Sequence, residues 1–156
     1  MPATKLKDFL DQNRVKYVSV RHSTAYASQE IAASAHVKGR NMAKTVVVRL
    51  SGKLALAVLP AKYNVDLELL AKAAGAGAAE LAAEEEFEKI FPGCETGAMP
   101  PFGNLYGLPV YVDETLTQDQ AIAFNAGSHT ELIQLAYADF ARLASPRVAH
   151  FSVLRH

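Results

Sequence analysis

The sequence lacks tryptophan and contains a single cysteine, Cys94. One cysteine cannot form an intramolecular disulfide, and it cannot supply the several thiolates of a cysteine-based metal cluster. No apolar run is long enough to cross a bilayer, and the N-terminus lacks the apolar core of a signal peptide. These absences predict a soluble protein of the cytoplasm.

The sequence also has no excess of charge of either sign. Sixteen basic residues balance sixteen acidic ones, so the formal net charge is zero. Overall charge therefore does not indicate a nucleic-acid or membrane partner, although a local basic patch can exist on a neutral protein. No membrane or DNA partner is expected, and the oligomeric state stays open.

The residues that are present predict one domain spanning residues 1–156. Half of them are hydrophobic, which is enough for a substantial core at this length. Because the predicted strands come in adjacent pairs separated by short helices, rather than in regular βαβ alternation, we expect a mixed α+β fold with a curled or partly closed sheet. Apolar or alternating runs predict strands at 15–20, 44–50, 53–59, 109–113, around 122–124, 132–135 and 148–153, and helical periodicity predicts helices at 4–13, 28–35, 66–75, 84–91 and 137–143.

Lys44 stands at the start of the most apolar of these strands. A lysine at this position can keep its stem against apolar neighbours and direct its ammonium into a cleft, where it would hold a phosphate or a developing oxyanion. The other interpretation is an edge lysine that discourages strand pairing.

Gly127, Ser128 and His129 form a predicted turn between the runs 122–124 and 132–135. Gly127 has no Cβ and can adopt a positive φ, so the turn would present a hydroxyl, an imidazole and backbone N–H groups at the rim of a sheet. Neighbouring serine and histidine do not make a catalytic pair, and no Gly-x-Ser-x-Gly motif surrounds Ser128. His22 and His36 have no metal-binding spacing, so neither a metal nor another cofactor is expected.

Residues 97–103 (GAMPPFG) place two prolines between glycines. Such a stiff segment suits the wall of a small pocket, and its plainer interpretation is a tight connector. Met99, Pro101 and Phe102 are the candidates for that wall.

The segments AKTVVVRL (43–50), GAMPPFG (97–103), PVYVD (109–113) and FNAGSHTELIQL (124–135), in this order, resemble the YbaK/ProX family of aminoacyl-tRNA editing domains. These domains also occur inserted in bacterial prolyl-tRNA synthetases. The resemblance spans residues 6–151. It implies a mixed, curled β-sheet or barrel surrounded by helices, and hydrolysis of the ester in a wrongly charged tRNA, often tRNA-Pro carrying Ala or Cys.

The resemblance also implies roles for individual residues. Lys44 matches the family lysine that is needed for activity, and Gly127, Ser128 and His129 match the glycine-serine-histidine turn of the branch that resembles the synthetase insertion domain. Gly97 and Pro101 match the glycine-x-x-x-proline loop beside the aminoacyl group, and His22 lies where many members carry a histidine after the first strand. With the candidates named above, the expected catalytic residues are Lys44, Gly127, Ser128 and His129. The expected substrate-binding residues are His22, Gly97, Met99, Pro101, Phe102 and Asn125.

Together these features predict a freestanding aminoacyl-tRNA deacylase that removes a small wrong amino acid from tRNA-Pro or another tRNA. No side chain is a convincing base, so a ribose hydroxyl of the terminal adenosine could relay the proton, while His129 would orient the substrate. A prolyl-tRNA synthetase or an elongation factor is a possible partner, since no basic tail is present to grip tRNA. Two alternatives stay open: a non-catalytic module that binds the tRNA acceptor end or a nucleotide, and a small-molecule esterase or amidase that uses Ser128.

Overall fold

The computed structural model describes residues 4–21, 42–91, 93–95 and 97–154. The predicted helix at 28–35, His22 and His36 lie outside the described residues. The described helices are α1 (Thr4–Gln12), α3 (Leu67–Ala74), α4 (Glu84–Phe87) and α5 (Tyr137–Ala144), with 3₁₀ turns η2 (Gly103–Leu105) and η3 (Glu114–Gln118). The strands are β1 (Tyr17–Arg21), β2 (Ala43–Leu50), β3 (Lys53–Pro60), β4 (Tyr63–Val65), β5 (Ala79–Leu81), β6 (Val110–Asp113), β7 (Ala121–Asn125), β8 (Glu131–Ala136), β9 (Arg147–Ala149) and β10 (Ser152–Leu154).

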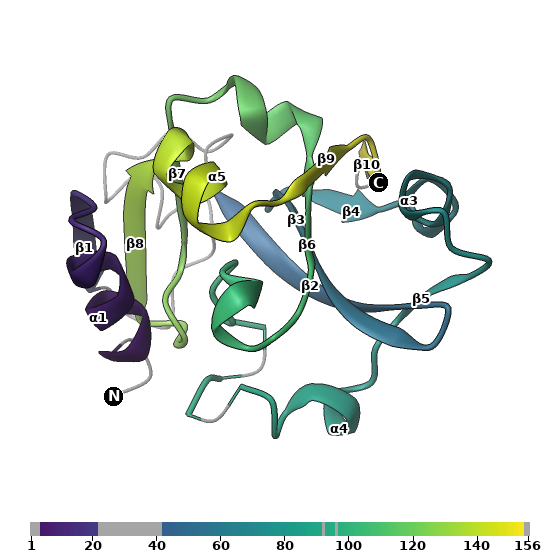
Figure 1. Ribbon diagram of the computed structural model, residues 1–156, viewed down its shortest axis with the longest axis horizontal. Coiled ribbons are helices and arrows are strands. Elements are labelled where there is room, and N and C mark those ends of the chain that lie inside the picture. The colour runs from purple at the N-terminus through teal and green to yellow at the C-terminus, as the bar shows by residue number, and fades with distance from the viewer. Residues whose placement is uncertain (1–3, 22–41, 92, 96, 155–156) are drawn as a thin grey trace.

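These strands form three sheets within the described residues. A mixed five-stranded sheet has the order β5-β2-β3-β6-β9, an antiparallel sheet has the order β1-β8-β7, and β10 pairs with β4. Figure 1 shows β1, β8 and α1 on one side of the molecule and the long, bent β2–β3 pair on the other. A parallel bridge between Met42 and Ala123 joins the start of β2 to β7. The predicted mixed α+β class is confirmed, and the described strands do not close into a barrel.

The β2–β3 hairpin forms where the sequence predicts it. Ser51 and Gly52 make the two-residue turn with φ values of 50° and 87°. Two consecutive positive φ values are typical of the type I′ turn, whose twist matches that of the flanking strands. The hairpin is the centre of the larger sheet because β2 also pairs with β5, and β3 also pairs with β6.

Helix α3 begins and ends at residues that the sequence also identifies. The Asp66 carboxylate accepts a hydrogen bond from the backbone N–H of Leu69 at 3.0 Å, which caps the first turn. Gly75 ends the helix in the left-handed conformation, at φ 67°. Leu70 is fully buried on the helix face that packs against the sheet. No helix in the described part of the chain is long and apolar enough to span a membrane.

Phe102 lies at the centre of the main hydrophobic core. Its ring centroid is 5.8 Å from that of Phe9, 5.9 Å from that of Phe124 and 5.5 Å from that of Phe140, all in edge-to-face geometry. This arrangement of aromatic rings is a favourable one. It joins α1, β7 and α5 to the segment that carries the predicted pocket wall.

The predicted single strand at 148–153 is wrong. The chain forms β9, which pairs with β6, and then β10, which pairs with β4 in another sheet. The buried carboxylate of Asp113 accepts hydrogen bonds from the backbone N–H groups of Phe151 and Ser152, at 2.9 and 3.0 Å. Because both bonds point to one side chain, neither N–H is available to a sheet ladder, and the chain leaves β6 at this point.

Candidate active site

The loop containing Gly97 and the turn containing Gly127 are joined through their backbones. The N–H of Glu95 donates to the carbonyl of Gly127 at 2.8 Å, and the N–H of Gly127 donates to the carbonyl of Ala98 at 2.8 Å. Both glycines have positive φ, 83° for Gly97 and 95° for Gly127. The two segments lie about thirty residues apart in sequence, and the fold brings them together.

His129 lies over Gly97 at this junction. A Cβ built on Gly97 would be 3.6 Å from Cε1 and 3.7 Å from Nε2 of the imidazole, so the ring is in van der Waals range of the glycine. The backbone N–H of His129 donates to a carboxylate oxygen of Glu95 at 3.0 Å. His129 is exposed.

Ser128 is oriented by its own turn. Its hydroxyl lies 3.1 Å from the Thr130 hydroxyl, and it accepts a hydrogen bond from the Thr130 N–H at 3.3 Å. This local pattern is a serine turn of the kind that stabilises loops. It gives no support to Ser128 as a nucleophile activated by His129.

The backbone N–H groups of the junction fall into two sets. Those of Gly127, His129 and Thr130 donate to protein acceptors. Those of Ser128 and Gly97 donate to no group within the described residues. Backbone N–H groups that already have a fixed direction are effective donors to a developing oxyanion. Ser128 and Gly97 are therefore the candidate oxyanion donors of this site.

Lys44 lies on β2, opposite Leu59, and its side chain is half-buried. The parallel bridge between Met42 and Ala123 aligns the start of β2 with β7. Lys44 lies two residues after Met42, and Asn125 lies two residues after Ala123. Each therefore lies on the same face of its strand as the bridged residue. Asn125 precedes Gly127 by two residues, so Lys44 lies on the strand that leads alongside the junction.

The predicted wall residues are buried rather than solvent-facing. Pro101 is buried, Met99 is 5% exposed and Phe102 is fully buried among aromatic rings. Met99 and Phe102 both belong to the main core. They support the Gly97 loop from behind, and their role as a wall beside the substrate stays a prediction. His22, the remaining predicted substrate-binding residue, lies outside the described part of the chain.

Glu131 follows the turn directly and was not identified from the sequence. Its buried carboxylate accepts a hydrogen bond from the Ser19 hydroxyl at 2.5 Å and forms an ion pair with Lys7. Burial alone would raise the pKa of Glu131, but these partners, with Arg21 at longer range, lower it below its usual value. The carboxylate thus fastens α1 and β1 to the first residue of β8. Ser19 lies 112 positions away in the sequence, so no local pattern indicates this contact.

Glu95 is the other residue that sequence reasoning missed. It accepts the His129 N–H through its side chain and donates to Gly127 through its backbone. Its partners lie more than thirty positions away, so no local pattern indicates them. Cys94 beside it is partly buried, and burial raises its thiol pKa, so the thiolate expected of a reactive cysteine is disfavoured.

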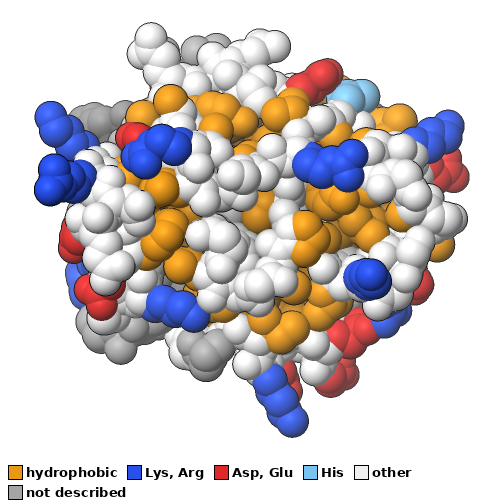
Figure 2. Space-filling model, viewed as in Figure 1, with side chains coloured by type: hydrophobic (Ala, Val, Ile, Leu, Met, Phe, Trp, Pro, Cys, Tyr) orange, Lys and Arg blue, Asp and Glu red, His pale blue; other side chains and the backbone are white. Residues whose placement is uncertain are grey.

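One face of the molecule carries dispersed charge. On the face shown in Figure 2, lysine and arginine side chains lie as separate groups, several of them beside acidic ones. No cluster of three or more histidine, cysteine, aspartate or glutamate residues with the geometry of a metal site occurs among the described residues.

Fold and site together define a mixed α+β domain in which two glycine-containing loops meet beside a lysine-bearing strand. Residues 22–143 match the model of the aminoacyl-tRNA editing domain, and the chain belongs to that family. The chain is 35% identical over 114 residues to the multifunctional Ser/Thr-tRNA deacylase ProXp-y of Escherichia coli (strain K12). The aligned region covers 70% of this chain and 68% of that protein.

Solved structures agree on the fold. A crystal structure of a candidate trans-editing enzyme for prolyl tRNA synthetase superposes with a TM-score of 0.83 at 22% identity, covering 97% of each chain. A scaffold protein used for computational epitope grafting gives a TM-score of 0.82 at 20% identity, again covering 97% of each chain. At these identities the structural likeness establishes the fold alone.

Proposed function

We propose that this protein hydrolyses the ester between a small, wrongly attached amino acid and the 3′-terminal ribose of a tRNA. The observation that carries the proposal is the junction of the Gly97 loop with the Gly127 turn beside the strand of Lys44. The junction offers backbone hydrogen-bond donors in a fixed direction and a nearby cation. It does not offer a serine activated by a histidine, so it suits a reaction in which water attacks a labile ester.

The substrate carbonyl would accept hydrogen bonds from the N–H groups of Ser128 and Gly97. Water attacks the carbonyl carbon, and the negative charge that develops on the carbonyl oxygen is stabilised by these donors. Lys44 would hold the phosphate of the terminal adenosine or share in stabilising that charge. His129, exposed and packed on Gly97, would orient the amino acid.

The proton released by the attacking water must reach the departing ribose oxygen. A ribose hydroxyl next to the ester can accept the proton from water and pass it to that oxygen as the carbon–oxygen bond breaks. The products are the free amino acid and an uncharged tRNA with both hydroxyls restored. No protein base is needed in this scheme, in agreement with the engaged hydroxyl of Ser128.

Serine and threonine are the first amino acids to test, since the relative from Escherichia coli is named for them. Alanine and cysteine on tRNA-Pro follow from the prolyl-tRNA synthetase resemblance. We also propose that a protein partner, a prolyl-tRNA synthetase or an elongation factor, holds the body of the tRNA. A net charge of zero supports this, because tRNA binding usually depends on many cationic contacts.

The test is deacylation of tRNAs charged with Ser, Thr, Ala or Cys by the pure protein, beside Lys44→Ala and Ser128→Ala variants. We expect hydrolysis of one or two species, a loss of about a hundredfold or more with Lys44→Ala, and a retained rate with Ser128→Ala. Loss of activity with Ser128→Ala would favour an esterase that uses this hydroxyl. Binding of tRNA without hydrolysis of any species would favour a non-catalytic module.

A further inference from the structure

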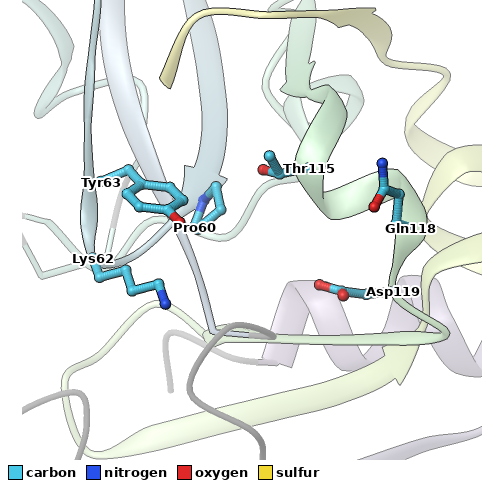
Figure 3. Close-up of a pocket in the computed structure, with 6 residues that line it drawn as sticks. All are labelled: Pro60, Lys62, Tyr63, Thr115, Gln118 and Asp119. Carbon is cyan, nitrogen blue, oxygen red and sulfur yellow. The ribbon is translucent and has the colours of Figure 1, made fainter. Parts of the chain in front are cut away.

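A polar pocket of about 320 Å³ opens between the end of β3 and η3, apart from the glycine junction (Figure 3). One wall comes from the turn after β3 and the start of β4, and the other comes from η3 and the residue after it. The lining residues are Pro60, Lys62, Tyr63, Thr115, Gln118 and Asp119.

This pocket adjoins the strands that lead to the candidate active site. The N–H of Ala61, within the first wall, donates to the carbonyl of Met42 at 2.8 Å. Met42 is bridged to Ala123 near the start of β7, and Asp119 precedes that strand by two residues. Lys44 stands two residues beyond Met42, which is about 7 Å along a strand. A nucleotide chain whose terminal ribose lies near Lys44 can therefore reach this pocket.

Tyr63 supplies an aromatic surface to the pocket. Its ring is half-buried, and the Lys62 ammonium lies 5.5 Å from the ring centroid, within the range of a cation–π contact. Because Tyr63 is half-buried and lines the pocket, the ring face that Lys62 contacts is the surface on which a nucleobase would stack. In Figure 3 the side chains of Lys62 and Asp119 extend toward the middle of the pocket from opposite walls.

The opposite wall suits a nucleoside better than a bare anion. The Asp119 carboxylate would repel a free phosphate, whereas it can accept a hydrogen bond from the exocyclic amine of cytosine or adenine. The Gln118 amide adds a donor and an acceptor for the edge of a base. When a base stacks on the Tyr63 ring, the Lys62 ammonium would leave that ring and pair with the phosphate that precedes the nucleoside.

We propose that this pocket binds a nucleoside of the single-stranded 3′ end of tRNA, with its base stacked on Tyr63 and its phosphate beside Lys62. The proposal rests on the proposed function for the identity of the RNA. Aromatic stacking joined to a nearby cation is how single-stranded RNA is commonly held.

The first experiment measures binding of an uncharged CCA trinucleotide by calorimetry. We expect Tyr63→Ala to weaken binding on the order of tenfold, because stacking contributes about that factor per base. Tyr63→Phe keeps the ring and should bind as the parent does. Lys62→Ala should also weaken binding, whereas Lys89→Ala, which removes an exposed lysine elsewhere, should not.

A second measurement does not depend on how the variants fold. The unaltered protein is titrated with a trinucleotide whose bases have been removed, and it should lose affinity by a factor similar to that of Tyr63→Ala. Failure of the parent to bind the trinucleotide would overturn the pocket assignment, as would equal binding by Tyr63→Ala. Binding of free CMP or AMP as tightly as the trinucleotide would overturn it in favour of a mononucleotide site.

Deacylation assays run in parallel separate this proposal from the proposed function. Hydrolysis of a mischarged tRNA with the same KM in the parent and in Tyr63→Ala would overturn the pocket and leave the deacylase standing. Trinucleotide binding that depends on Tyr63, with no hydrolysis of any charged tRNA, would support the pocket and overturn the deacylase. If both proposals are right, Tyr63→Ala raises KM far more than it lowers kcat.

Discussion

Asp113 is a buried residue whose replacement should strongly destabilise this fold. It is completely buried, and one carboxylate oxygen accepts the N–H groups of Phe151 and Ser152. The other oxygen accepts the hydroxyl of Thr115 at 2.5 Å and its N–H at 3.2 Å. The carboxylate therefore ties the bend between β9 and β10 to the first turn of η3.

The Asp113→Ala variant leaves two buried N–H groups without acceptors. An unsatisfied buried donor costs about 1–3 kcal/mol, so the two together predict a loss of about 2–6 kcal/mol in the free energy of unfolding. In a chain of this length that corresponds to a fall of about 4–24 °C in Tm. Urea unfolding followed by circular dichroism measures the change. Glu88→Ala, which replaces an exposed acid, is the matched control and should stay within about 0.5 kcal/mol of the parent.

The effect should also depend on pH in a stated direction. Burial alone would raise the pKa of Asp113, but the hydrogen bonds from Phe151, Thr115 and Ser152 outweigh burial and lower it below its usual value. A lowered pKa in the folded state means that the carboxylate stabilises the protein above its unfolded pKa, about 3.9, and that this contribution is lost as pH falls through the folded value. The parent should thus lose its advantage over Asp113→Asn as the pH drops below about 4.

Two results would refute this reasoning. One is an unfolding midpoint of Asp113→Ala equal to that of the parent at neutral pH, which would mean that Phe151 and Ser152 find other acceptors. The other is a gap between parent and Asp113→Asn that stays constant from neutral to acidic pH, which would mean that the carboxylate charge does not matter.

Three further predictions concern the surroundings of the junction. Gly97→Ala should cost about 1–2 kcal/mol in unfolding free energy because the φ of Gly97 is positive. It should also lower the deacylation rate because His129 packs on this glycine, and an unchanged rate would mean that the His129 imidazole takes no part in the reaction. Glu95→Ala should lower kcat, whereas its free energy of unfolding in urea should stay within about 0.5 kcal/mol of the parent because Glu95 is exposed. Glu95→Gln keeps an acceptor for the His129 N–H and should retain most of the rate. Glu131→Ala should lower the unfolding free energy by about 1–3 kcal/mol at neutral pH, because it leaves the partly exposed Lys7 and the Ser19 hydroxyl without their acceptor. The difference from the parent should shrink in acid, and thermal unfolding at several pH values tests both expectations.

Much of the fold follows from local signals in the sequence. The Ser51–Gly52 turn, the Asp66 cap and the helix at 137–143 are each determined by residues close together in the chain, so their positions are predictable within one or two residues. Strands β4 and β5 are only three residues long, too short for a periodic pattern to appear.

In the candidate site too, features with a local sequence signal are predictable and features that depend on distant partners are not. The two loops are recognisable because glycine and proline constrain the backbone locally. The contributions of Glu95, Glu131 and Asp113 could not, since each acts through partners that are distant in sequence. Phe102 is a different case, because it was predicted to face a pocket and lies in the core. An aromatic residue in a loop has the same appearance in sequence whether it faces a ligand or the core.

The placement of donors in the junction affects how mutational data on this protein should be interpreted. The candidate oxyanion donors are the backbone N–H groups of Ser128 and Gly97, which no ordinary side-chain substitution removes. Replacement of the serine hydroxyl tests a nucleophile and leaves the donor in place, so a retained rate would agree with the proposed chemistry. The conformation of Gly97 determines where the donor points, and a Cβ there strains that conformation. A site in which Gly97→Ala is more harmful than Ser128→Ala is therefore one that catalyses through its backbone.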